Sequence, residues 1–330
     1  MNFFRPALAT LVAVSLTGCA ALTGEDEPAS SDGSGTVAAA LYPLAYVAER
    51  VAGDAVDVEN LTSPGGEPHD LELGVRETAL VTDAALVVHV SGLQPAVDAA
   101  VAENASGDVL DAADVVDLLP VEDDEHAHEH GEEHGDEEHA DEEHADEEGH
   151  EGHEGHDHGD HDPHFWLDPL RMAELGDALA DRLADLDPGG AETFRANAAD
   201  LRADLEELDA EYAAGLAGCA RDTVVTNHDA FGYLEKYGLH LVSITGLSPD
   251  AEPSPAALAD LQELIREEGV TTVFSESLVS PKTAEVLADD AGVGTAVLDT
   301  VEGLTDDTED EDYGSLMRRN LAALQEANGC

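Results

Sequence analysis

The sequence contains very little positive charge. It has 13 Lys or Arg residues against 75 Asp or Glu residues, and its formal net charge is -62 at pH 7. A surface this acidic repels phosphate backbones, which excludes nucleic acid as a partner. The pattern His-Glu-x-x-His, which places two zinc ligands and a general base on one helix, does not occur, and this argues against a secreted zinc hydrolase. At 330 residues the chain is long enough for two domains.

Long apolar runs are scarce as well. The run of residues 7–16 follows Arg5 and is too short to span a bilayer. Residues 16–19, Leu-Thr-Gly-Cys, resemble the bacterial lipobox. That resemblance implies a lipoprotein signal peptide of residues 1–18, lipidation of Cys19, and a flexible tether of residues 19–35 outside the cytoplasmic membrane. A plain secretory signal with an incidental cysteine is the alternative.

Short apolar runs of strand length alternate with segments long enough for a helix. In the first half, strands are expected at 37–41, 56–61, 86–90 and 115–119, and helices at 42–51 and 77–85. In the second half, strands are expected at 223–226, 240–245, 270–274 and 295–298, and helices at 230–237, 255–268, 281–288 and 312–327. This alternation predicts an α/β fold of two Rossmann-like lobes with parallel sheets, residues 36–187 and 219–330.

Two helix start signals lie between the lobes. Asp168 and Pro169 form an N-cap and first-position pair that opens one helix. Asp187 and Pro188 repeat that signal, and apolar residues at helical spacing follow. We therefore expect one long helix over residues 188–218, which joins the two lobes as a stiff strut.

Residues 122–162, here called the histidine-rich segment, contain 11 histidines, 21 Asp or Glu residues and no Lys or Arg. Their apolar side chains are no larger than Ala, so we expect a mobile loop that buries too little surface to order itself. Imidazoles interleaved with carboxylates are ligands for zinc and similar ions. The candidate ligands are His126, His128, His130, His134, His139, His144, His150, His153, His156, His158 and His161. A solubilising acidic spacer is the alternative.

Five histidines lie outside this segment. His89 and His240 fall within expected strands, where a structural role with a satisfied hydrogen bond is more common. His69, His164 and His228 lie instead in turns that follow a strand or precede a helix. Because ligands of open α/β sheets bind beyond the carboxyl ends of the strands, these three side chains can converge on one crevice.

Four motifs around these residues occur in an order known from one family. They are Gly-Glu-Pro-His-Asp (66–70), His-Phe-Trp-Leu-Asp-Pro (164–169), His-Asp-Ala-Phe-Gly-Tyr (228–233) and Leu-Asp (298–299). With the lipobox and the histidine-rich segment, residues 36–330 resemble the metal-binding lipoproteins of zinc and manganese ABC importers, high-affinity zinc uptake type. The resemblance implies two lobes joined by a rigid helix, with a metal in the cleft between them. The metal ligands it implies are His69, His164, His228 and Asp299.

The function implied by the resemblance is capture of Zn²⁺ outside the cytoplasm and its delivery to the permease and ATPase of an ABC importer. The protein would be a lipid-anchored monomer at the cell membrane and not an enzyme. Three imidazoles and one carboxylate suit tetrahedral zinc, whereas Mn²⁺ favours more oxygen ligands. Glu67 is the alternative carboxylate ligand, because some zinc members use an acid beside the first histidine. A cell-surface metal buffer or adhesin without a transporter is the alternative function.

The remaining two cysteines, Cys219 and Cys330, would both lie outside the membrane, where disulfides persist. We expect a bridge between them that ties the second lobe together. Two free thiols, or thiolate ligands of another zinc site, are the alternatives.

Overall fold

The computed structural model describes residues 35–121 and 161–330. All of them belong to one compact unit, Gly33–Cys330. The predictions for the signal peptide, Cys19 and most of the tether lie outside the described residues. So do those for the histidine-rich segment up to residue 160, which includes every predicted ligand there except His161.

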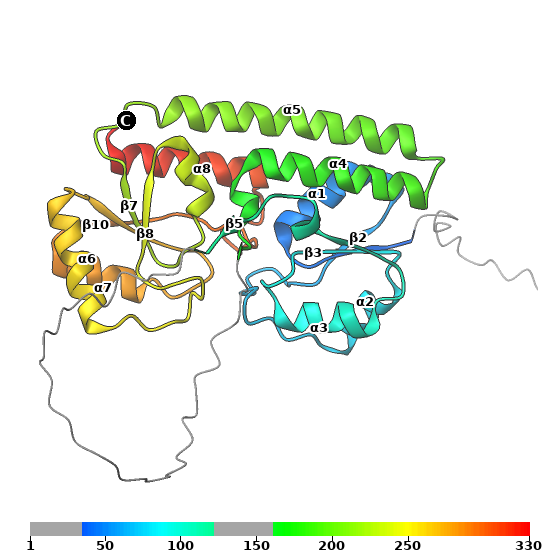
Figure 1. Cartoon of the computed structure of the whole chain (residues 1–330), viewed down its shortest axis with the longest axis horizontal. Helices are drawn as coiled ribbons and strands as arrows, with labels where there is room; N and C mark the ends of the chain where they lie inside the picture. Colours follow the sequence, from blue (N-terminus) through cyan, green and yellow to red (C-terminus); the bar gives the residue numbers. More distant parts are fainter. Residues whose placement is uncertain (1–34, 122–160) are drawn as a thin grey trace, which may run out of the picture. The chain divides into compact units, whose positions relative to one another are not determined.

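The first lobe is built on a four-stranded parallel sheet in the order β2-β1-β3-β4. Its strands are β1 (Val37–Ala39), β2 (Val58–Asn60), β3 (Leu86–His89) and β4 (Asp108–Asp111), and its connecting helices are α1 (Tyr42–Ala52), α2 (Val75–Asp83) and α3 (Pro95–Asn104). The central strands β1 and β3 are buried throughout, as expected for a parallel sheet covered by helices on both faces. In Figure 1, α2 and α3 cover one face of this sheet and α1 covers the other.

One part of the first lobe differs from the prediction. No strand forms over residues 115–118 of the strand expected at 115–119, and the fourth strand of the sheet is β4, which follows the unpredicted helix α3. A 3₁₀ turn, η2 (Ala112–Asp114), follows β4, and the Asp111 side chain accepts a hydrogen bond from Ala113 N. The edge strand β4 begins and ends with Asp, so its apolar run is too short to predict a strand from the sequence.

The second lobe repeats this architecture, with strand order β10-β9-β7-β8, all parallel. Its strands are β7 (Thr223–Thr226), β8 (His240–Ser243), β9 (Thr272–Ser275) and β10 (Gly294–Val297). Its helices are the 3₁₀ helix η5 (Gly232–Tyr237), α6 (Pro255–Glu267), α7 (Lys282–Ala291) and α8 (Tyr313–Asn328). Each lies where the sequence predicted an element, although the helix expected at 230–237 is of the 3₁₀ type.

Two antiparallel helices connect the lobes: α4 (Pro169–Leu186) and the 25-residue α5 (Ala191–Gly215). Asp168 caps α4 by accepting a hydrogen bond from Leu170 N. The long helix starts after Gly190 and not at Pro188. At 1.5 Å per residue it is about 38 Å long, and it contacts α1 and α4 of the first lobe and α8 of the second. Figure 1 shows it running across both lobes, which confirms the predicted strut.

The larger hydrophobic core is continuous across the two lobes. One cluster of buried residues includes the central strands β1 and β3 of the first lobe and residues of α5 and α8, such as Tyr212 and Tyr313. A smaller cluster around Val225 and Ile265 lies within the second lobe. Because side chains of both lobes pack in one cluster, the junction between the lobes is part of the hydrophobic core.

The two ends of the histidine-rich segment are paired with each other. Strand β5 (Leu119–Pro120) is antiparallel to β6 (His161–Asp162). His161 and Asp162, the last two residues of the predicted loop, thus belong to this strand pair. Tyr233 joins both strands, since its hydroxyl donates to Asp162 O and accepts from Leu119 N.

The predicted disulfide is confirmed: Cys219 and Cys330 are bonded, with 111 residues of sequence separation. Backbone hydrogen bonds from Ala220 N and Arg221 N to Asn328 O hold the same two segments together.

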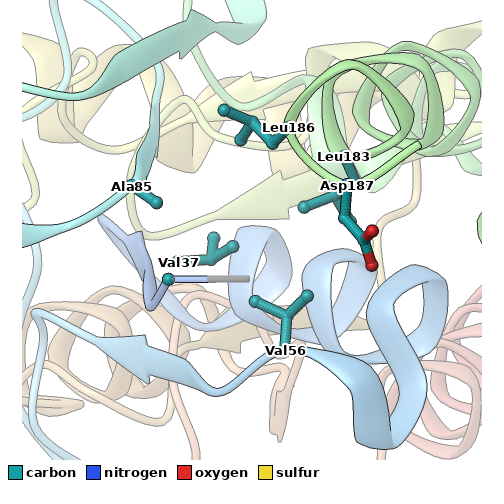
Figure 2. Close-up of a pocket in the computed structure, with 7 residues that line it drawn as sticks. Val37, Val56, Ala85, Leu183, Leu186 and Asp187 are labelled. Carbon is teal, nitrogen blue, oxygen red and sulfur yellow. The ribbon is translucent and has the colours of Figure 1, made fainter. Parts of the chain in front are cut away.

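Among the described residues, no helix combines the length and the hydrophobicity that a membrane span needs. Figure 2 shows a mostly apolar hollow at the start of β1, lined by Val37, Val56 and Leu183. Its volume is about 10 Å³. A space of this size takes one water at most, so it is a gap in the packing and not a ligand site.

Candidate metal centre

Four buried side chains from loops beyond the strands meet between the two lobes. His69 lies in the loop between β2 and α2, and His164 lies at the start of the 3₁₀ helix η4 (Phe165–Leu167). His228 follows β7, and Glu302 follows β10. Each offers one ligand atom, and these four atoms all lie within 4.8 Å of one another. All four residues are at most 2% exposed, so the group is shielded from water.

The distances within the group suit a small cation. His69 Nε2 lies 3.2 Å from His164 Nε2. Glu302 Oε1 lies 3.6 Å from His164 Nε2 and 3.9 Å from His228 Nε2. Ligands about 2.0 to 2.1 Å from a tetrahedral zinc ion are about 3.3 Å apart. His228 Nε2 and Glu302 Oε1 are buried and have no hydrogen-bond partner, which is costly unless something else binds them.

Every histidine of the group is held by a carboxylate through its other ring nitrogen. His69 Nδ1 lies 2.6 Å from Glu67 Oε1, and His164 Nδ1 lies 2.7 Å from Asp162 Oδ1. His228 Nδ1 lies 2.7 Å from Glu276 Oε2, and His228 N donates to Glu276 Oε1. When Nδ1–H donates to a carboxylate, Nε2 carries the lone pair, which is the arrangement that a metal-binding imidazole needs.

The structure thus brings together the three predicted histidines but replaces the predicted carboxylates. Glu67, the alternative ligand, is the hydrogen-bond partner of His69. Asp299 is not part of the group, because its oxygens accept hydrogen bonds from Val301 N and the Ser277 hydroxyl. The carboxylate beside the histidines is that of Glu302, three residues further on, and not that of the predicted ligand Asp299.

Sequence reasoning missed Glu302 because the last motif of the resemblance, Leu-Asp at 298–299, ends at Asp299. The available signal was a second acid in the same loop, in Leu-Asp-Thr-Val-Glu-Gly at 298–303. Nothing in that pattern indicates which of the two acids turns inward.

The electrostatics of the centre favour bound protons when no metal is present. Burial raises the pKa of Glu302 to about 8, although the neighbouring His69 acts in the opposite direction. Burial lowers the pKa of His69, but its hydrogen bond to Glu67 and the charge of Glu302 outweigh this, so that pKa is raised. Burial also raises the pKa of Glu67, yet the hydrogen bond and charge of His69 hold it below its usual value. A metal ion therefore competes with protons near neutral pH.

The other described histidines lie outside this centre. His89 is buried at the end of β3, with Nδ1 3.2 Å from Asp98 Oδ1, in keeping with the structural role expected for it. His240 lies in β8 as predicted but is exposed. His161 is exposed in β6.

Comparison with known proteins places the chain in a family. The family model described as zinc-uptake complex component A, periplasmic, matches residues 37–327. The zinc-binding lipoprotein AdcA of Streptococcus pneumoniae is 36% identical over 333 residues, which cover 97% of this chain and 60% of AdcA. The high-affinity zinc uptake system protein ZnuA of Bacillus subtilis is 32% identical over 297 residues, which cover 88% of this chain and 86% of ZnuA.

A solved structure agrees with these sequence matches. The crystal structure of Zn(II)-bound AdcA from Streptococcus pneumoniae matches with a TM-score of 0.70 and 32% identity, over 90% of this chain and 58% of that one. This chain therefore spans about 60% of the length of AdcA. The two-lobed fold and the buried histidines between the lobes agree with the family match over residues 37–327. The chain belongs to the ZnuA family of zinc-uptake components.

Proposed function

We propose that this protein binds one Zn²⁺ ion as cargo through His69, His164, His228 and Glu302. The observation that carries the proposal is the group itself: three imidazoles and one carboxylate, all buried, within 4.8 Å of one another. Two of the four ligand atoms have no hydrogen-bond partner. Burial of unpaired polar atoms is unfavourable for folding, so their retention is best explained by an ion that binds them.

The chemistry of the group favours zinc over manganese and transport over catalysis. Three nitrogens and one oxygen match the tetrahedral preference of zinc, whereas manganese prefers more oxygen ligands. A zinc hydrolase keeps one coordination position for water. Here four buried protein ligands close the coordination sphere, so the ion is held and not used as a catalyst.

The relatives suggest where the cargo goes. Their names describe a zinc-binding lipoprotein and a zinc uptake system. We infer that this protein works outside the cytoplasm, anchored through a lipid on Cys19 after removal of residues 1–18, as a monomer. It would pass zinc to the permease and ATPase of an ABC importer. The domain limits predicted from the sequence, residues 36–187, 188–218 and 219–330, are part of the same proposal.

The histidine-rich segment would collect zinc for the centre. Strand β6 ends at Asp162, whose carboxylate holds His164, so an ion held by this segment would be tethered next to a ligand. Tethering gives local concentrations up to about millimolar. Deleting residues 122–160 should lower the number of bound zinc ions to about one and slow loading at scarce zinc, with the affinity of the centre unchanged. An unchanged loading rate would contradict this role.

The proposed cargo is tested by zinc titration of the purified protein with a competing chelator. His228→Ala should remove the tight site, and His240→Ala is the matched control because that histidine is exposed in β8. Growth on limiting zinc should fall with His228→Ala alone. Tight binding that survives His228→Ala would show that the centre is not the cargo site.

A further inference from the structure

One residue beside the metal centre has a strained backbone. Val301 has φ of 58°, and among the described residues it is the one with positive φ that is not glycine. This left-handed conformation is rarely adopted by β-branched residues, because the branched side chain crowds the backbone. Val301 is also fully buried. Strain of this kind persists only where surrounding contacts enforce it, and it often occurs at functional sites.

The contacts that enforce it come from Asp299. Its Oδ1 accepts a hydrogen bond of 2.7 Å from Val301 N, and its Oδ2 accepts one from the Ser277 hydroxyl. Asn320 on α8 fixes the backbone of the same residue, since its Oδ1 accepts from Asp299 N at 2.8 Å and its Nδ2 donates to Asp299 O at 2.7 Å. Asp299 is therefore held at its backbone and at both carboxylate oxygens.

A residue of the first lobe, Trp166, also holds the turn at residues 299–302. Trp166 Nε1 donates to Thr300 O at 2.7 Å, and Trp166 O accepts from the Tyr313 hydroxyl at 2.6 Å. Trp166 lies two residues after His164. The turn that carries the carboxylate of the second lobe is thus fastened to the segment that carries a histidine of the first.

The conformation of Val301 affects the placement of the next residue, Glu302. The left-handed turn at Val301 sets the direction in which Glu302 leaves the backbone, and an ordinary φ at that position would send its side chain elsewhere. Glu302 Oε1 accepts no hydrogen bond, so no such contact aims this oxygen at the histidines. The Glu302 carboxyl has a side-chain hydrogen bond with Thr300, which belongs to the same turn. The placement of Glu302 therefore depends on the turn that precedes it.

We propose that Asp299 is a positioning residue for the zinc ligand Glu302, which it aims by holding Val301 in the left-handed conformation. The inference rests on the proposed function, because it assigns Asp299 an effect on zinc affinity. Asp299 touches no ion and acts only through the turn at residues 299–302. Partners that orient a ligand in this way typically change metal affinity by about 10- to 100-fold when they are removed.

The test is zinc affinity measured by chelator competition in a matched set of variants. Asp299→Ala should weaken binding by about 10- to 100-fold. Asp299→Asn keeps an oxygen that accepts from Val301 N and should bind zinc nearly as well as the original protein. Adding Val301→Gly to Asp299→Ala should restore most of the affinity, because glycine takes positive φ without strain. Far-ultraviolet circular dichroism and melting of the metal-free proteins show whether each variant is folded.

A double-mutant cycle with Glu302→Ala separates positioning from a general loss of structure. If Asp299 acts through Glu302, Asp299→Ala causes no further loss of affinity once Glu302 is Ala. A second loss of the same size overturns the proposal, as does Asp299→Asn binding as poorly as Asp299→Ala, which would mean that the charge of Asp299 matters. If His228→Ala leaves tight binding intact, the zinc site itself is wrong. If His228→Ala abolishes binding while Asp299→Ala binds normally, only the positioning role fails.

Discussion

Two of the polar places where the lobes meet differ in how their charges are paired. In the metal centre, His228 Nε2 and Glu302 Oε1 are buried without hydrogen-bond partners. Between α1, α5 and α8, a groove of about 250 Å³ is also lined by charged side chains. There Arg50 already contacts Asp204 at 2.7 Å and donates to the Tyr46 hydroxyl.

The difference shows what marks an ion site. The groove is larger, but the charges named there already have partners and are partly exposed, so a ligand gains little by entering. The centre is small and dry, and its unpaired atoms would gain strongly from a cation. The number of acids at a place says less than whether their oxygens are buried and unpaired.

Among the variants that test this comparison, Glu302→Ala should have the largest effect on zinc affinity. Removing a direct ligand should weaken zinc binding by more than about 100-fold, the upper limit for residues that only support a ligand. Chelator competition measures the change. Asp299 should not replace the lost ligand, because its oxygens accept hydrogen bonds from Val301 N and the Ser277 hydroxyl. A loss below tenfold would count against Glu302 as a ligand.

A smaller loss is expected from Glu276→Ala, which removes the carboxylate behind His228. Glu276 accepts hydrogen bonds from both His228 N and His228 Nδ1, so its loss should cost about 10- to 100-fold in zinc affinity. Glu285→Ala, at an exposed position of α7, is the matched control. Equal affinities of the two variants in a zinc titration would mean that this carboxylate does not support the site.

Acidification should weaken zinc binding by about tenfold per pH unit for each proton that zinc displaces. The pKa of Glu302 is raised from 4.5 to about 8 by burial, so below pH 8 this group holds a proton that zinc must remove. The unfolded chain loses that proton at lower pH, so the stability of the metal-free protein falls as pH rises from 4.5 towards 8. Calorimetry at pH 7 in buffers of different ionisation enthalpy should detect at least one released proton. Binding without proton release would contradict the raised pKa.

The smallest effect on zinc affinity is expected from a substitution in the groove. Arg50→Ala removes a contact whose side chains are 35% and 62% exposed, and such surface pairs contribute about 0 to 1 kcal/mol. Zinc affinity should be unchanged, while thermal unfolding shifts slightly. A large loss of affinity would show that the groove and the centre are coupled through α1 and α5.

Most of the fold could be predicted because its signals are local. Asp168 with Pro169 starts α4, and the apolar spacing along α5 indicates a long helix. The region around α3 and β4 was missed because its apolar pattern is weak: α3 buries only Val97 and Ala100, and β4 is bounded by Asp108 and Asp111.

The site was predictable only in part, for a different physical reason. His69, His164 and His228 stand in recognisable turns after strands or before helices, so their convergence followed from topology. The position of Glu302 depends on a left-handed turn at Val301. The sequence does not indicate this turn, because the residue there is neither Gly nor Asn. That conformation is imposed by Asp299, Asn320 and Trp166, which are brought together only by the folded chain.

The bond between Cys219 and Cys330 makes the second lobe a covalent ring. Within that ring lie His228 and Glu302, whereas His69 and His164 lie on the linear part of the chain. One proteolytic cut between residues 219 and 330 would open a loop and leave the molecule in a single piece. Such a nick would be invisible on a denaturing gel until a reductant was added, and the two ring ligands would stay linked to the rest of the protein.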